Sequence, residues 1–241
     1  MTTLFVSDLH LDPAQPRATA RFIALLGGAA RSAGALYILG DLFEAWVGDD
    51  DDAGLPAEVG AALRACADAG TRIAFLHGNR DFLLGSAYAA RSGLQLLPEE
   101  VVIDVEGVPT LLLHGDTLCT DDHAYQAFRR QARDPGWQAA MLSQPLPVRR
   151  QLAAAARAHS AQHTAMSAAS IMDVAPRSVL AAFARHGVRR MIHGHTHRPA
   201  IHTLLAQDGA VAERIVLGDW HVRGSVLAVD GESLRLSEFD D

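Results

Sequence analysis

The sequence TLFVSDLH at residues 3–10 places a short apolar run directly before an aspartate and a histidine. Four more stretches repeat this arrangement: ALYILGD at 35–41, IAFLHGNRD at 73–81, TLLLHGD at 110–116 and RMIHGHTH at 190–197. Each run has the length and the aliphatic content of a buried strand. We call the five polar stretches that follow these runs the strand-end clusters, and together they predict a site built where strands end.

The segments between these runs indicate how the strands are connected. Helical patterns at about 17–32 and 56–69 separate the first three runs, which predicts βαβ units and a parallel sheet. In such sheets ligands bind beyond the carboxyl ends of the strands, where all five clusters lie. After Gly194 the pattern changes to strands at about 200–205, 212–217, 225–229 and 233–238, which predicts a second, mainly antiparallel sheet. We expect one α/β domain over residues 1–241.

Composition limits the possible functions. The 241 residues are 49% hydrophobic and carry a net charge of −7, which argues against nonspecific nucleic-acid binding. All 21 cationic residues are arginine. No apolar stretch approaches the roughly 20 residues that span a bilayer, and a strand beginning right after Met-Thr-Thr leaves no room for a signal peptide. The two cysteines, Cys66 and Cys119, are too few for a disulfide framework and fit small buried apolar residues.

The polar residues of the clusters suit divalent metal ions. A single Asp-x-His or Gly-Asp after a strand is more often a turn or a helix cap than a ligand, but five in one chain are not a coincidence. The candidate ligands are carboxylate, imidazole and amide groups without a thiolate, which suits Mn²⁺, Fe²⁺ or Zn²⁺. They are Asp8, His10, Asp41, Asn79, His114, His195 and His197. Seven ligands exceed the needs of one ion, and a pair of ions roughly 3.5–4 Å apart activates water for attack at phosphorus.

These clusters resemble the signature blocks of the calcineurin-like metallophosphoesterases. The resemblance covers the chain from Asp8 to His197 and implies an α/β sandwich of two mixed sheets flanked by helices. It implies that Asp41 bridges two metal ions and that Asp41, Arg80 and His195 are catalytic. The resemblance places Asp8, His10 and His197 at one ion, and Asn79, His114 and His195 at the other.

Arg80 departs from many members of this family, which have histidine after the asparagine of the third cluster. A guanidinium is no proton donor near pH 7, but it can bind a phosphate through two hydrogen bonds. We therefore interpret Arg80 as a clamp on the transferred phosphate. The alternative is a structural salt bridge with Asp81.

Three longer stretches narrow the resemblance to one branch of the family. LGDLFEAWVGDDD at 39–51, DTLCTDD at 116–122 and IMDV at 171–174 resemble the branch that hydrolyses UDP-2,3-diacylglucosamine in lipid A biosynthesis. That resemblance implies attack of water on the α-phosphorus, giving UMP and 2,3-diacylglucosamine 1-phosphate, with Mn²⁺ as the usual metal. It implies substrate contacts from Asn79, Arg80, Asp122, Ser160, Thr164, Ser167 and His195. Thr164 and Ser167 depart from the usual asparagine and lysine.

The segment 122–172 is an insertion with helical patterns at about 123–133, 137–142 and 148–169. It holds six arginines (129, 130, 133, 149, 150 and 157) interleaved with apolar residues. One interpretation is a helical hairpin packed on the core with solvated arginines. The other is a cap over the metals, whose apolar face takes acyl chains while the arginines meet anionic lipid at the cytoplasmic face of the inner membrane. Composition leaves both open, and the resemblance favours the cap.

The missing lysine leads to a further hypothesis. A diphosphate substrate needs compensating charge, and Arg157 lies three residues before Ser160, on the same helical face. Arg157, or failing that Arg149 or Arg150, can replace the lysine; alternatively Arg157 is solvated and Arg80 with the metals suffices. Two rival functions remain at this point: a different phosphodiesterase or nuclease of the family, and a scaffold without activity, against which the complete ligand set argues. We expect no protein partner and no nucleic acid.

Overall fold

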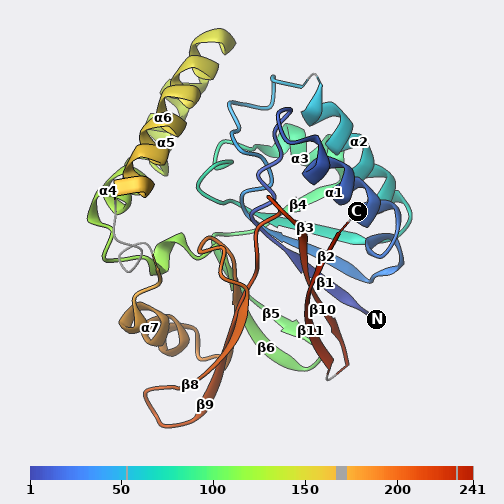
Figure 1. Cartoon of the computed structure of the whole chain (residues 1–241), viewed down its shortest axis with the longest axis vertical. Coiled ribbons are helices and arrows are strands. Elements are labelled where there is room, and N and C mark those ends of the chain that lie inside the picture. Colours follow the sequence, from blue (N-terminus) through green and yellow to red (C-terminus); the bar gives the residue numbers. More distant parts are fainter. Residues whose placement is uncertain (53, 167–172, 232, 241) are drawn as a thin grey trace.

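The computed structural model describes residues 1–52, 54–166, 173–231 and 233–240. Two β-sheets lie face to face, with helices on the outer side of each (Figure 1). The described helices are α1 (Pro16–Gly27), α2 (Leu55–Asp68), α3 (Ser86–Ser92), α4 (His123–Ala132), α5 (Pro135–Leu142), α6 (Leu146–Met166) and α7 (Pro176–His186). Short 3₁₀ turns are η1 (Ala30–Ser32) and η2 (Asp116–Leu118).

The first sheet has the strand order β11-β10-β1-β2-β3-β4. Its strands are β1 (Thr3–Val6), β2 (Ala35–Leu39), β3 (Arg72–Leu76), β4 (Leu94–Leu96), β10 (Gly224–Asp230) and β11 (Ser233–Phe239). β1 to β4 run parallel, as the βαβ pattern predicts, and β10 pairs antiparallel with β1.

The second sheet has the order β5-β6-β7-β9-β8. Its strands are β5 (Glu100–Val105), β6 (Val108–Leu113), β7 (Arg190–His193), β8 (Ala200–Leu205) and β9 (Val211–Val216). β6, β7 and β9 run parallel, while β5 and β8 form antiparallel hairpins with β6 and β9. Both sheets are thus mixed, as the family resemblance implies.

The prediction that the last four strands form their own antiparallel sheet is wrong. β8 and β9 join the second sheet, whereas β10 and β11 complete the edge of the first. The physical reason is that alternating apolar residues fix which face of a strand is buried but do not specify its neighbour. Here Leu227 of β10 lies opposite Phe5 of β1, and both are buried between the sheets.

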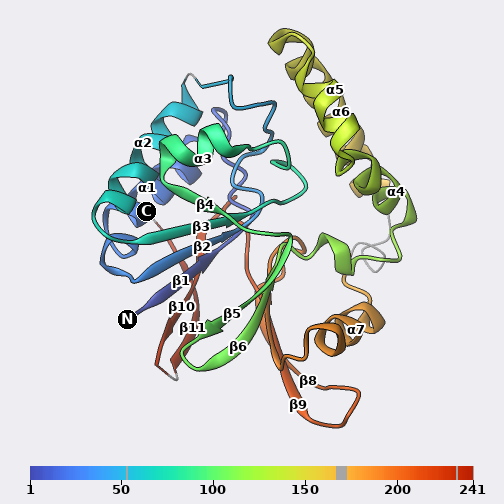
Figure 2. The same cartoon turned by 180° about the vertical axis from the view of Figure 1, so that it is seen from behind.

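Three apolar clusters hold these layers together. Residues of β1, β2, β3, β6, β7, β9 and β10 interlock between the two sheets. Helices α1, α2 and α3 cover the outer face of the first sheet, and α7 packs its Val179 and Phe183 on the outer face of the second (Figures 1 and 2). Polar side chains can therefore lie at the carboxyl ends of the parallel strands, beyond the apolar core.

One described helix is shorter than its sequence pattern, and the end of another lies outside the described residues. The expected helix at 17–32 ends at Gly27, where Gly28 donates to the carbonyls of Ala24 and Leu25, and only the 3₁₀ turn η1 follows. The long helix expected to reach residue 169 is α6, which projects away from the two sheets (Figure 2). Positions 167–169 lie outside the described residues.

The loops at the strand ends are joined by backbone hydrogen bonds. Asp8 donates to the carbonyl of Gly40 at 3.1 Å, His10 to that of Asp41 at 2.9 Å, and Gly194 to that of His114 at 2.8 Å. These bonds link β1 to β2 and β6 to β7 beyond the ends of the sheets. The backbone of the strand-end clusters is therefore fixed independently of any bound ligand.

Gly194 gives a test of this close packing. A Cβ there would lie 2.1 Å from Asp8 Oδ2 and 2.2 Å from Ser7 Oγ, so Gly194→Ala requires the loops to separate. We expect a loss of about 1–3 kcal/mol in the free energy of unfolding, measured by urea denaturation. Gly27→Ala in α1 is the control, because a Cβ there meets nothing within 4 Å. Equal stability of the two variants would contradict the close approach.

Candidate metal centre

Strained backbone marks the candidate site. Among described residues other than glycine, six have a positive φ, and five of these six belong to the strand-end clusters. The five are Asp8 (53°), His10 (49°), Asp41 (54°), His195 (68°) and His197 (54°). Such conformations cost about 1–2 kcal/mol per residue and gather where function requires them. The left-handed turns re-aim each side chain from the sheet toward a common centre.

One group of ligand atoms lies at the ends of β1 and β7. His197 Nε2 is 3.3 Å from Asp8 Oδ1 and 3.3 Å from His10 Nε2. His10 Nε2 is in turn 3.9 Å from Asp8 Oδ1. One ligand atom each of Asp8, His10 and Asp41 lie within 4.8 Å of one another. The four residues that the family resemblance assigns to one ion are thus brought together.

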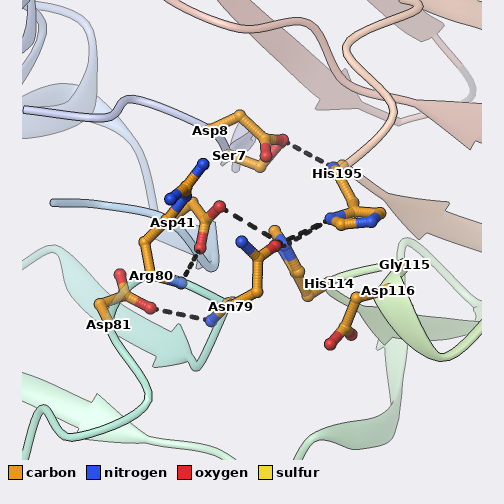
Figure 3. A network of polar contacts seen from close by, with 12 residues as sticks. Ser7, Asp8, Asp41, Asn79, Arg80, Asp81, His114, Gly115, Asp116 and His195 are labelled. Atoms are coloured by element: carbon orange, nitrogen blue, oxygen red, sulfur yellow. Dashed lines mark hydrogen bonds and ion pairs between the residues drawn. The ribbon is translucent and has the colours of Figure 1, made fainter. Parts of the chain in front are cut away.

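A second group joins the ends of β3, β6 and β7. Asn79 Oδ1 lies 2.9 Å from His114 Nε2 and 2.9 Å from His195 Nδ1, and the two imidazole nitrogens are 3.2 Å apart (Figure 3). His114 Nδ1 donates to the carbonyl of Leu39 at 2.9 Å, so its Nε2 carries the lone pair. Burial, together with the neighbouring His114, lowers the pKa of His195 to about 4, which keeps that imidazole neutral. Three atoms that could bind a metal ion therefore converge.

Asp41 stands between the two groups. Its Oδ2 is 3.7 Å from His10 Nε2 and 3.7 Å from His114 Nε2. Its Oδ1 accepts a hydrogen bond of 2.8 Å from the backbone N–H of Arg80 (Figure 3). This is the place that a carboxylate bridging two ions would occupy.

The donor set fits divalent cations. Asp8 Oδ2 accepts from Ser7 Oγ at 2.6 Å and from the His195 backbone N–H at 2.8 Å, while the buried Oδ1 has no hydrogen-bond partner. A buried carboxylate oxygen without a donor is costly unless a cation faces it. Burial lowers the pKa of His197, but the neighbouring carboxylates of Asp8 and Asp219 raise it to about 9. The site thus favours positive charge at its centre.

Buried polar residues behind the ligands hold them in place. Asp81 Oδ1 accepts from the backbone N–H of Gly78 at 2.9 Å and its Oδ2 from that of Leu42 at 2.7 Å. Both oxygens are thus used by the backbone, and Arg80 instead approaches Glu44, with Nη1 3.9 Å from Oε1. The alternative of a structural salt bridge between Arg80 and Asp81 is therefore wrong.

Helix α4 is anchored beside the second group of ligands. Asp116 Oδ2 accepts from Tyr125 Oη at 2.6 Å and from Arg129 Nε at 2.7 Å. The Tyr125 ring lies against the His195 ring, with centroids 5.8 Å apart. Asp122 caps α4, since its Oδ1 accepts from the Tyr125 backbone N–H at 2.9 Å. Asp122 was expected at the substrate, and the structure places it at the start of the helix that carries Tyr125.

A cavity of about 400 Å³ lies next to the candidate metal centre. Asn79 and Arg80 of the body and Ser160 of α6 line it together with Arg157, so three expected substrate contacts share one cavity with the proposed replacement for lysine. Apolar side chains of the body and of α4, α5 and α6 form much of the remaining wall: Trp46, Val47, Phe82, Leu83, Phe128, Trp137, Met141 and Leu152. Thr164 lies on α6, but its side chain and all of Ser167 are outside the described part of the chain.

Five of the six arginines in the insertion pair with carboxylates outside it. Arg129 and Arg133 contact Glu99, Arg149 contacts Asp50, Arg150 contacts Asp51, and Arg157 contacts Asp12. For these five the interpretation as freely solvated charges is wrong. Arg149, Arg150 and Arg157 thus tie α6 to the loops after β1 and β2, while Arg129 and Arg133 tie the end of α4 to Glu99, just before β5.

The cysteines agree with their interpretation as small buried residues. Cys66 and Cys119 are both buried. Burial and the nearby Asp116 raise the pKa of the Cys119 thiol to about 12, so it stays neutral.

Residues near the centre that the sequence analysis missed lie in the loop after β9. Asp219 Oδ2 is 3.4 Å from His197 Nδ1, and the His221 ring stacks on the His10 ring. A signal was present, because IVLGDWH at 215–221 has the same form as the five strand-end clusters. Glu44, whose Oε2 is 2.9 Å from His10 Nδ1, was also missed.

Comparisons with known proteins agree with this architecture. The calcineurin-like phosphoesterase family matches residues 1–199, and the chain belongs to that family. The chain is 53% identical over 246 residues to a protein of Xanthomonas oryzae pv. oryzae named UDP-2,3-diacylglucosamine hydrolase, covering 99% of both chains. A protein of the same name from Serratia proteamaculans is 53% identical over 239 residues, again covering 99% of each. The solved structure of an archaeal phosphodiesterase has a TM-score of 0.50 at 12% identity, covering 99% of this chain and 100% of its own, which supports the fold.

The position of Asp41 between the two groups predicts the effect of its removal. We expect the wild-type protein to bind two divalent ions and Asp41→Ala to lose both, because one carboxylate serves the two sites. Metal content after chelation and addition of Mn²⁺ measures this directly. Asp68→Ala is the matched control, since Asp68 is an exposed residue at the end of α2. Full metal content in Asp41→Ala would exclude a bridging role.

Proposed function

We propose that this protein hydrolyses the diphosphate of UDP-2,3-diacylglucosamine at the α-phosphorus, giving UMP and 2,3-diacylglucosamine 1-phosphate. The observation that carries the proposal is a candidate metal centre that shares Asn79 and Arg80 with the adjoining apolar cavity. A diphosphate with acyl chains on one side requires both parts. The 53% identity to proteins named for this reaction supports the same assignment.

Seven side chains would hold two divalent ions in this proposal. Asp8, His10, Asp41 and His197 hold one, and Asp41, Asn79, His114 and His195 hold the other. Such a pair supplies a water nucleophile at neutral pH and compensates charge on the phosphoryl oxygens. The mixture of oxygen and imidazole donors without thiolate is compatible with Mn²⁺, which is the metal we propose.

Arg80 has two tasks in the proposed reaction. Its backbone N–H holds Asp41 Oδ1 at 2.8 Å and thereby orients the bridging carboxylate. Its guanidinium lines the cavity, where it can bind two phosphoryl oxygens at once. Glu44 limits its movement from the other side, at 3.9 Å.

The cavity suits the acylated sugar. Its apolar walls exclude water from acyl chains, and each buried methylene contributes about 0.8 kcal/mol to binding. Residues 122–172 act as a cap in this proposal, because α4, α5 and α6 supply one wall while the body supplies the other. Asn79, Ser160 and Thr164 contact the polar part of the substrate, and His195 approaches its phosphate. Ser167 is proposed as a contact on the basis of the resemblance alone.

Arg157 is the best placed of the three candidates for the missing lysine. Arg149 also lines the cavity, but it is buried and bound by Asp50, and the more exposed Arg150 is bound by Asp51. Arg157 lines the cavity, and its buried Nε has no hydrogen-bond partner in the structure. Its single carboxylate contact is long, with Nη1 3.3 Å from Asp12 Oδ2. Arg157 thus retains donors for an anionic head group.

We further propose that the protein binds the cytoplasmic face of the inner membrane from outside the bilayer. No described helix is long and apolar enough to cross a membrane. The inserted helices expose Phe128, Leu142, Val148 and Leu152 to between 37% and 44%, and these side chains can enter a lipid surface. Because five of the six arginines are paired, we assign lipid contact chiefly to these apolar residues.

Product analysis in ¹⁸O-labelled water tests the function and the site of attack together. We expect UMP and 2,3-diacylglucosamine 1-phosphate from UDP-2,3-diacylglucosamine, with the label in UMP, because water attacks the α-phosphorus. Mass spectrometry of both products gives the answer. Asp41→Ala with the same substrate is the control for background hydrolysis. Label in the acylated sugar phosphate would place the attack on the other phosphorus, and intact substrate would refute the proposed function.

A substitution that keeps the positive charge of Arg80 tests whether its bidentate contact with phosphate is needed for catalysis. Arg80→Lys keeps a cation and the backbone N–H but loses the bidentate phosphate contact, so kcat should fall to less than about a tenth. Arg17→Lys, an exposed position on α1, is the matched control. Steady-state kinetics and the unfolding temperature are measured for both. Unchanged kinetics with a lower unfolding temperature would make Arg80 a structural residue.

A further inference from the structure

A sixth polar stretch reaches the metal centre from the second sheet. The segment IVLGDWH at 215–221 follows the end of β9. β9 pairs parallel with β7, so their carboxyl ends lie at the same edge of the sheet, and β7 leads into His195 and His197. The backbone N–H of Trp220 donates to the carbonyl of Asp8 at 3.2 Å, which fixes this loop beside the first group of ligands.

His221 lies against the two histidines of that group. Its ring stacks on the His10 ring with centroids 5.4 Å apart and an interplanar angle of 10°. The centroid of the His197 ring is 6.0 Å away. One ring nitrogen of each of His10, His197 and His221 lies within 4.8 Å of the other two. Three imidazoles from three different loops thus surround one point.

The three imidazoles are oriented by the same kind of contact. His10 Nδ1 is 2.9 Å from Glu44 Oε2, and His197 Nδ1 is 3.4 Å from Asp219 Oδ2. His221 Nδ1 is 3.2 Å from Gln15 Oε1. An oxygen beside Nδ1 favours the tautomer with the proton on Nδ1 and the lone pair on Nε2, which is the arrangement that metal-binding histidines show in proteins. In that tautomer His221 has its Nε2 available to bind an ion.

We propose that His221 is a further protein ligand of the ion held by Asp8, His10, Asp41 and His197, and that it binds through Nε2. The inference rests on the two-ion centre of the proposed function. A neutral nitrogen donor suits a borderline divalent cation such as Mn²⁺, Fe²⁺ or Zn²⁺. Asp219 and Gln15 then act as positioning residues, because they hold the rings of His197 and His221 without touching the ion.

Two variants distinguish a ligand from a ring that only packs. His221→Phe keeps an aromatic ring over His10 but removes the nitrogen, whereas His221→Ala removes both. His202→Ala is the control, since His202 is an exposed histidine on β8. Because His221 is itself exposed, both variants should fold, which unfolding curves can verify. Metal titrations with Mn²⁺, and the absorption spectrum of the Co²⁺-loaded protein, report on the site without substrate.

If His221 is a ligand, both variants should lose at least about tenfold in affinity for one of two ions and change the Co²⁺ spectrum. The other ion and the His202→Ala control should behave as in the wild type. If His221→Phe binds both ions with wild-type affinity and shows the wild-type Co²⁺ spectrum, the inference is overturned. This holds even if His221→Ala binds one ion weakly, because loss of ring stacking on His10 would then explain the weaker binding. Failure of the wild-type protein to bind two ions would instead refute the proposed function.

Discussion

The structure depends on the repulsion between electron-rich atoms that the fold forces together around Asp41. Its carboxylate faces one imidazole of each ligand group at 3.7 Å, and the nearby carboxylate of Asp8 has an oxygen without a donor. In a buried environment such a set is unstable unless positive charge lies between its members. Divalent ions, which the calcineurin-like phosphoesterase family uses, would satisfy this requirement. Binding of such ions would also offset the cost of the strained backbone at five of the candidate ligands.

The loops hold the candidate ligands close together through contacts of their own backbone. Asp81 ties the loop after β3 to the loop after β2 through two backbone N–H groups. The glycines of the clusters allow contacts that side chains would prevent, as at Gly78, where a Cβ would meet Asp41 Oδ1 at 2.1 Å. The site is preorganised by its backbone, so little conformational entropy is lost when ions bind.

The sequence permitted the site to be predicted more completely than the sheets. All seven candidate ligands lie at strand ends because a continuous apolar run stops where its polar residues begin, and this is a local property of the chain. The partner of a strand is not local: β10 and β11 carry the same alternation as β8 and β9 but pair with the first sheet. The loop after β9 was not predicted to belong to the site, for a different reason. In the sequence, Gly218-Asp219 resembles an ordinary turn. Only the structure shows that β9 pairs with β7, which leads into the candidate ligands His195 and His197.

The arginines of the insertion were seen in the sequence as one basic region, but their partners could not be. Asp12, Asp50, Asp51 and Glu99 are far from them along the chain and lie in loops around the site. A planar guanidinium binds a carboxylate through two N–H groups, and Arg149 does so with Asp50. Helices fastened in this way have their charge largely neutralised by the body. Compensating charge for a diphosphate would then come from ions at the candidate metal centre and from Arg80 and the incompletely bonded Arg157, which both line the adjoining cavity.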